Sequence, residues 1–95
     1  LPSFCTECYR ILDIVSVPMT RTLKEGETYT FSIRPKTGLG WAIDLSGEWI
    51  DDWVISDDGI YTMTLTISRN GTLSIRAKLC EGKIYNRAIT YDVKK

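Results

Sequence analysis

Apolar and polar side chains alternate along three successive runs in the second half of the chain, and this pattern constrains the fold most. The runs cover residues 61–67, 72–79 and 85–93. A period of two is typical of a strand with one buried and one solvated face, because successive side chains point to opposite sides of a sheet. We therefore expect three consecutive antiparallel strands, with Arg87 as the exception to the pattern.

Further runs in the first half of the chain predict more strands. Pro18 ends or bends the first of them, since proline lacks the N–H donor that a ladder needs. Asp51 and Asp52 interrupt the last, which indicates an edge strand or a bulge. These runs are residues 9–17, 28–34, 40–45 and 48–55. About seven strands with regularly spaced turns predict an all-β fold, an immunoglobulin-like antiparallel β-sandwich.

Length and composition indicate one globular domain. The chain has 95 residues, of which 43% are hydrophobic and 25% charged, and these values are ordinary for such a domain. We expect residues 1–8, which show no periodicity, to be a loose N-terminal lead-in, and residues 9–95 to form a single immunoglobulin-like domain. Because the chain begins with Leu1 rather than Met, we expect an excised or processed piece of a longer protein.

Charge and hydropathy argue against two kinds of partner. Twelve basic and twelve acidic residues leave no net charge, so the basic patch typical of nucleic-acid binding is not indicated. No apolar run approaches the roughly 20 residues that cross a bilayer, and no signal peptide is recognisable. We expect no nucleic-acid partner and no membrane insertion. The sequence does not fix the location, and an extracytoplasmic or cell-surface position is favoured over a cytoplasmic one.

The residues of the common catalytic sites are missing. The chain has no histidine, so Ser-His-Asp and Cys-His arrangements are excluded, and no glycine-rich phosphate loop is present. Acidic residues gather between positions 44 and 58, but they lack EF-hand spacing, and turn formation is favoured over calcium binding. Glycoside hydrolysis needs two carboxyl groups across a cleft, which a small sandwich rarely offers. We expect no enzymatic activity, no metal and no cofactor.

The three cysteines leave two arrangements open. Cys5 and Cys8 form a Cys-x-x-Cys pair, whereas Cys80 stands far away in the sequence. Without histidine the ligands are too few for a typical zinc site, and no helix pattern follows the pair as a thioredoxin-like motif requires. Either one disulfide forms and leaves an odd thiol, or all three thiols are free.

Asn70, Gly71 and Thr72 carry two signals at once. The triplet matches an N-glycosylation acceptor. Asn-Gly between two alternating runs is also a strong signal for a β-hairpin turn. We predict the hairpin turn and leave glycosylation open.

The tryptophans are the most distinctive candidates for binding. Trp41, Trp49 and Trp53 lie close together in the sequence, and large, rigid aromatic side chains suit both sugar stacking and protein contacts. Trp49 and Trp53 are four residues apart, so they share a strand face unless a bulge intervenes. The structural alternative makes Trp41 the core tryptophan of the third strand, with the other two plugging a sheet edge.

Several short motifs resemble filamin-type immunoglobulin repeats, and bacterial immunoglobulin-like repeats share them. The motifs are Gly26 to Phe31, Leu39 to Gly47, Asp58 to Leu65, Asn70 to Ile75 and Glu81 to Ile84. The chain differs from the repeats in lacking a proline between Thr66 and Asn70. In such repeats a partner peptide adds a strand beside the third and fourth strands. The resemblance therefore implicates residues 41–45 and 49–55 in docking.

Together these observations predict a non-enzymatic structural spacer and protein-interaction module that docks an extended partner segment at a sheet edge. An edge strand offers unpaired backbone groups to such a segment. The expected partner is a protein or peptide, or a neighbouring domain of the same chain. Asp51 and Asp52 would select a basic or polar ligand, or would merely keep the edge from aggregating. The alternative is a cell-surface carbohydrate-binding module that uses exposed tryptophans. The candidate partner-binding residues are Trp41, Ile43, Asp44, Trp49, Asp51, Asp52 and Trp53.

Overall fold

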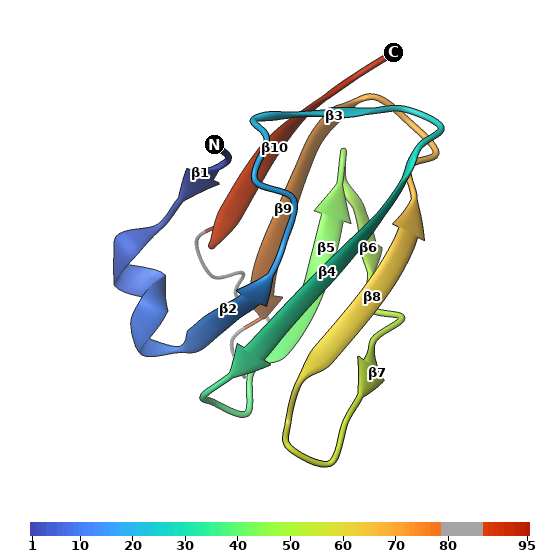
Figure 1. Ribbon diagram of the computed structural model, residues 1–95. Helices are drawn as coiled ribbons and strands as arrows, with labels where there is room; N and C mark the ends of the chain where they lie inside the picture. Colours follow the sequence, from blue (N-terminus) through green and yellow to red (C-terminus); the bar gives the residue numbers. More distant parts are fainter. Residues whose placement is uncertain (79–86) are drawn as a thin grey trace.

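In the computed structural model, which describes residues 1–78 and 87–95, the strands form two sheets packed together (Figure 1). The six-stranded sheet has the order β1-β10-β9-β5-β6, with β3 also paired to β10. The four-stranded sheet has the order β2-β4-β8-β7. The elements are β1 (Ser3–Phe4), the 3-10 helix η1 (Thr6–Arg10), β2 (Leu12–Ser16), β3 (Thr22–Lys24), β4 (Thr28–Pro35), β5 (Gly40–Leu45), β6 (Glu48–Ile50), β7 (Val54–Ile55), β8 (Tyr61–Thr66), β9 (Gly71–Lys78) and β10 (Ile89–Lys94).

This strand order is that of an immunoglobulin-like sandwich. One sheet of such a sandwich carries strands A, B, E and D, and the other carries G, F and C, extended in variable-type domains by a further strand beside C. Strands β2-β4-β8-β7 and β10-β9-β5-β6 follow these two orders. The predicted fold class is confirmed, but the described residues contain ten strands rather than about seven. The additional strands have two or three residues, too few to show a period.

The core lies between the sheets and consists of the side chains that the alternation predicted to face inward. Burying each large apolar side chain stabilises the fold by roughly 1.5–3 kcal/mol relative to leaving it exposed. The buried residues on the inner faces of the long strands are Phe31, Ile33, Trp41, Ile43, Leu45, Met63, Leu73, Ile75, Ala77, Ile89, Tyr91 and Val93. The inner faces of β4, β5, β8 and β9 are therefore as predicted.

The chain changes sheets between β2 and β3. Strand β2 pairs with β4, and its register shifts between Ile14 and Ser16. After Pro18 the chain crosses over, and β3 runs parallel to β10. The hydroxyl of Tyr91 donates a hydrogen bond of 2.8 Å to the carbonyl of Pro18. This bond links β10 to the crossover.

Residues 3–10 correct the prediction of a loose lead-in. Strand β1 pairs with β10, and the N–H of Cys5 donates to the carbonyl of Ala88 at 2.9 Å. Cys5 and Cys8 form a disulfide, so the structure has the bonded arrangement. Cys80 lies outside the described residues. A two-residue strand followed by a short 3-10 helix has no periodicity, and the sequence pattern therefore missed both.

The predicted hairpin at Asn70 and Gly71 is wrong. Strand β8 belongs to the four-stranded sheet and β9 to the six-stranded sheet, so the chain crosses between sheets here. Gly71 has a φ of 123°, and a Cβ at this position would overlap Oγ of Ser46. Glycine is therefore required by a close approach to the β5–β6 turn. Of the three predicted consecutive strands, β9 and β10 pair with each other, and the connection over residues 79–86 lies outside the described residues.

Candidate partner-binding edge

The β5–β6 hairpin comes directly before the segment that was predicted to bind a partner at a sheet edge. Its two turn residues, Ser46 and Gly47, have φ values of 49° and 95°, which suit the tight turns that favour the right-handed twist of a hairpin. Oδ1 of Asp44 accepts the N–H of Gly47 at 2.9 Å. Strand β6 ends after only three residues, at Ile50. It is the outermost strand of its sheet.

The chain then crosses from one sheet to the other at residues 51–53. Asp51 and Asp52 are exposed, whereas the indole N–H of Trp53 donates to the carbonyl of Trp41 at 2.7 Å. The Trp53 ring also meets the Tyr61 ring edge-on, with centroids 6.1 Å apart. Trp53 thus fixes the connection over residues 51–53 to β5 in one sheet and to β8 in the other. The prediction of one strand over residues 48–55, interrupted at Asp51 and Asp52, is wrong in that the interruption is a crossing: residues 51–53 connect β6 to β7 in the other sheet (Figure 1).

Strand β7 is an outermost strand with two exposed apolar side chains. It pairs with β8 through Val54 opposite Thr62 and Ile55 opposite Tyr61. Val54 is 74% exposed and Ile55 is 56% exposed. The next pair is hydrogen-bonded, since the N–H of Ser56 donates to the carbonyl of Ile60 at 2.9 Å. Hydrogen-bonded and non-hydrogen-bonded pairs alternate in an antiparallel ladder, so the N–H and C=O of Ile55 point away from β8.

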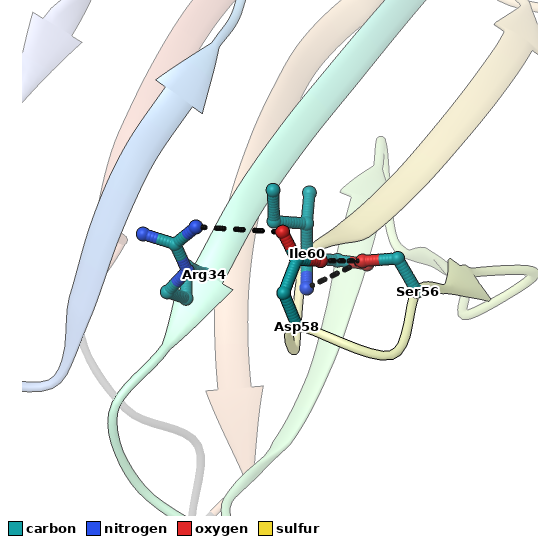
Figure 2. A network of polar contacts seen from close by, with 4 residues as sticks. All are labelled: Arg34, Ser56, Asp58 and Ile60. Atoms are coloured by element: carbon teal, nitrogen blue, oxygen red, sulfur yellow. Dashed lines mark hydrogen bonds and ion pairs between the residues drawn. The ribbon is translucent and has the colours of Figure 1, made fainter.

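A polar network shapes the turn after β7 (Figure 2). Oγ of Ser56 donates to the carboxylate of Asp58, and the N–H of Ile60 donates back to Oγ of Ser56 at 3.1 Å. Arg34 on β4 lies 3.9 Å from the same carboxylate. The hydrogen bond from Ser56 lowers the pKa of Asp58, desolvation opposes this, and Arg34 adds to the lowering. The network favours a charged Asp58 and ties the turn to β4.

Acidic side chains bracket β7 on both sides. Asp51 and Asp52 lie shortly before β7, and Asp57 and Asp58 lie after it, separated from its last residue by Ser56 alone. All four are exposed. A segment lying along β7 would therefore meet an apolar centre with negative charge at each end. We call residues 51–58 the β7 edge.

The structure separates the predicted binding residues into three groups. Asp51, Asp52 and Trp53 belong to the β7 edge. Trp41 and Ile43 are 3% and 0% exposed, and β5 has β9 and β6 on its two sides, so these side chains lie inside the sandwich. Asp44 and Trp49 lie on the outer face of the six-stranded sheet, because they pair across β5 and β6.

The environment of the tryptophans bears on sugar binding. Trp49 lies on β6, whereas Trp53 lies in the connection that follows it, so the strand is interrupted between them and the condition for a shared strand face is not met. Nζ of Lys78 lies 4.9 Å from the ring centroid of Trp49, in the geometry of a cation–π interaction. The indole N–H of Trp53 is already bonded to Trp41. Both tryptophans are half-buried, and each already makes a contact within the protein.

Sequence reasoning did not single out Val54 and Ile55. The signal was the segment Asp51-Asp52-Trp53-Val54-Ile55-Ser56-Asp57-Asp58, in which acidic pairs flank two β-branched residues. The period-two pattern assigned only residues 48–55 to one strand, and the resemblance implicated Val54 and Ile55 only as part of the range 49–55.

Comparison with known proteins adds no assignment. No family model matches the chain, and no curated protein matches it significantly. Within residues 1–78 and 87–95, no helix is long and apolar enough to cross a membrane. The same residues contain no cluster of three or more His, Cys, Asp or Glu side chains suited to hold a metal ion.

Proposed function

We propose that this protein is a non-enzymatic interaction and spacer module that docks an extended, basic partner segment along β7. The observation that carries the proposal is the combination on one outermost strand of exposed Val54 and Ile55 with outward backbone groups. A partner strand would lie about 4.8 Å from β7 and pair with Ile55. The resemblance to filamin-type repeats supports the same mode, since their fourth strand corresponds to the segment that contains β7.

Charge at the β7 edge supports a partner with lysine or arginine near both ends of its extended segment. Asp51 and Asp52 lie before β7, and Asp57 and Asp58 lie after it. A second copy of this chain paired antiparallel through β7 would bring these carboxylates against one another. Like charges in close apposition disfavour association, whereas opposite charges favour and steer it. The chemistry therefore selects a basic partner over self-association.

The proposal is tested by titrating the ¹⁵N-labelled protein with a lysine-flanked peptide of alternating valine and threonine. We expect the largest amide shifts at Val54 and Ile55 and slower hydrogen exchange at Ile55. The same peptide with glutamate in place of lysine should bind far more weakly, because it meets the carboxylates of Asp51, Asp52 and Asp57, whereas Asp58 already lies beside Arg34. Shifts spread over other strands, or equal binding of both peptides, would contradict the proposal.

Substitution at Ile55 separates backbone pairing from side-chain contact. Ile55→Pro removes the outward N–H, which β8 does not use, and proline is tolerated on edge strands. We expect peptide affinity to fall about fivefold or more, the value of one lost hydrogen bond. Ile55→Val keeps the donor and should bind nearly as the parent does. If the acidic pairs only prevent aggregation, replacing Asp51 and Asp52 by Asn will increase aggregation while no variant binds the peptide.

A further inference from the structure

A hollow of about 320 Å³ lies on the outer face of the six-stranded sheet, separate from the β7 edge. It lies where the β5–β6 turn meets the start of β9. Pockets that hold small ligands have volumes from roughly 300 Å³ upward, so this hollow suits a ligand of monosaccharide size. Its lining residues are Asp44, Ser46, Gly47, Gly71, Thr72, Ser74 and Arg87.

Backbone geometry and one serine hold the walls of the hollow in place. Oγ of Ser46 donates to the carbonyl of Asn70 at 2.8 Å and accepts the N–H of Thr72 at 3.3 Å. Gly47 and Gly71 both have positive φ, and they contribute backbone rather than side chains to the lining. The turn and the start of β9 are thereby joined, and the space between them stays open.

Among the residues that the structure describes, one cation of the hollow has no ion-pair partner. Nη1 of Arg76 lies 2.8 Å from Oδ2 of Asp44, and their side chains are only 21% and 16% exposed. This pair neutralises the one carboxylate of the lining. Arg87 is exposed, and within the described residues it makes no ion pair. Counted over the described residues, the hollow therefore has a net positive charge, and the Arg87 guanidinium can donate to an anionic group in two parallel hydrogen bonds.

The position of Arg87 explains its exceptional place in the sequence pattern. Strand β10 begins only at Ile89, so Arg87 precedes the regular strand and does not face the core. The lining also carries hydroxyl groups from Thr72 and Ser74. Oγ of Ser74 lies 3.3 Å from Oγ1 of Thr90. Hydroxyl groups both donate and accept hydrogen bonds, and the oxygens of Asp44 retain lone pairs for a ligand hydroxyl.

We propose that this hollow binds a small carboxylated polyol, of which a hexuronic acid is the representative. The carboxylate pairs with Arg87, and the ligand hydroxyls bond to Asp44 and Thr72, while the buried Ser74 forms the floor of the hollow. This site does not depend on the tryptophans or on docking at β7. Recognition needs both parts of the ligand, since the cation selects the acid and the hydroxyl-lined wall selects the polyol.

The test is a titration of the ¹⁵N-labelled protein with sodium glucuronate, glucose, acetate and inorganic phosphate in separate experiments. We expect glucuronate to shift the amides of Gly47 and Gly71 in a saturable way, with much weaker shifts from the other three. Equal shifts from acetate or phosphate would reduce the site to a simple anion site and overturn the proposal. Equal shifts from glucose would show that charge plays no part in binding and would contradict the proposal. The absence of any shift with glucuronate would show that the hollow does not bind this ligand and would also contradict it.

Two variants and a control assign the binding to the lining residues. Arg87→Gln should weaken glucuronate binding by roughly tenfold or more, because a charge-assisted hydrogen bond is lost. Arg10→Gln removes the same charge from the exposed surface of η1 and should bind as the parent does. Thr72→Val removes one hydroxyl from the lining while keeping a β-branched side chain, and should weaken binding about threefold or more. Unchanged affinity in Arg87→Gln or in Thr72→Val would contradict the assignment.

Discussion

Strand β10 has further strands of the chain paired with it on the side away from β9, whereas β7 has none among the described residues on the side away from β8. Strand β1 pairs with the start of β10, and β3 pairs with its end. We call this the closed edge. At the β7 edge the described residues supply no further strand beyond β7, and Val54 there is 74% exposed.

Unpaired strand edges invite pairing with other chains, and natural proteins protect them by cover, by shortness or by charge. The closed edge uses cover, whereas the β7 edge uses shortness and charge, and only the second remains accessible to a partner.

The largest expected contrast is in stability. Leu23 on β3 is 1% exposed at the closed edge, so Leu23→Ala leaves a cavity and should cost about 2–5 kcal/mol of unfolding free energy. Val54→Ala at the β7 edge should change it by no more than about 0.5 kcal/mol, as expected of an exposed site. Urea unfolding monitored by tryptophan fluorescence measures both. Similar losses in the two variants would mean that β7 contributes to the core.

A smaller effect is expected at the turn that presents β7. Gly59 has a φ of +82°, with nothing within 4 Å of an added Cβ. Gly59→Ala is therefore strained by its backbone conformation alone, at about 1–2 kcal/mol. Peptide binding should weaken with it, because the turn sets the position of Ile55. Gly38→Ala is the matched control, since its φ is not positive and its Cβ also meets nothing. A loss of stability or peptide affinity in Gly38→Ala as large as in Gly59→Ala would refute this account.

Tyr91 tests how the closed edge is held. Tyr91→Phe removes the hydrogen bond to Pro18 and should cost about 1 kcal/mol. Burial also raises the pKa of Tyr91 above its ordinary value near 10. The unfolded chain therefore releases this proton first as pH rises, so the stabilising contribution is complete below about pH 10 and declines above it. Unfolding measured between neutral and alkaline pH should show this decline in the parent, and a smaller decline in Tyr91→Phe.

The smallest effect concerns acid pH at the β7 edge. The pKa of Asp58 is lowered by its hydrogen bond from Ser56, so its contribution is present above the ordinary carboxyl pKa and is lost as pH falls through the lowered value. Below that range the Ser56–Asp58 bond changes, and the bonded amides of Ser56 and Ile60 should lose protection against hydrogen exchange, measured relative to the intrinsic exchange rate at each pH. Exchange at Leu23 should not respond. Asp58→Asn should remove the pH dependence, and a variant that keeps it would place the titrating group elsewhere.

The sequence predicted the elements that are long enough to show a period. Strands β4, β5, β8 and β9 have six to eight residues, and their inner faces were identified correctly. Strands β1 and β3 were missed, because so few residues carry no pattern. The Asn70-Gly71 signal was local, and a local signal cannot tell whether the next strand joins the same sheet.

The candidate site was predicted in part for similar reasons. Asp51 and Asp52 were assigned to an edge because they break a strand pattern, and the structure places them beside β7. Trp41 and Ile43 were predicted to bind a partner because of the resemblance to filamin-type repeats. The alternation of apolar and polar residues had already placed both side chains on the inner face of their strand. Arg87 and Ser74 line the same hollow, and this proximity depends on where β10 begins, which residue spacing does not encode.

The antiparallel pairing of β1 with β10 has a mechanical consequence. Ser3 lies opposite Thr90, and both ends of the chain therefore lie toward the same end of the sandwich (Figure 1). Tension applied between Leu1 and Lys95 would pull these two strands apart like a zipper, so that their hydrogen bonds break one after another rather than together. We expect the first event in a single-molecule stretching experiment to be the peeling of β1 at low force. Stretching would then uncover the start of β10 while β3 still covers its end.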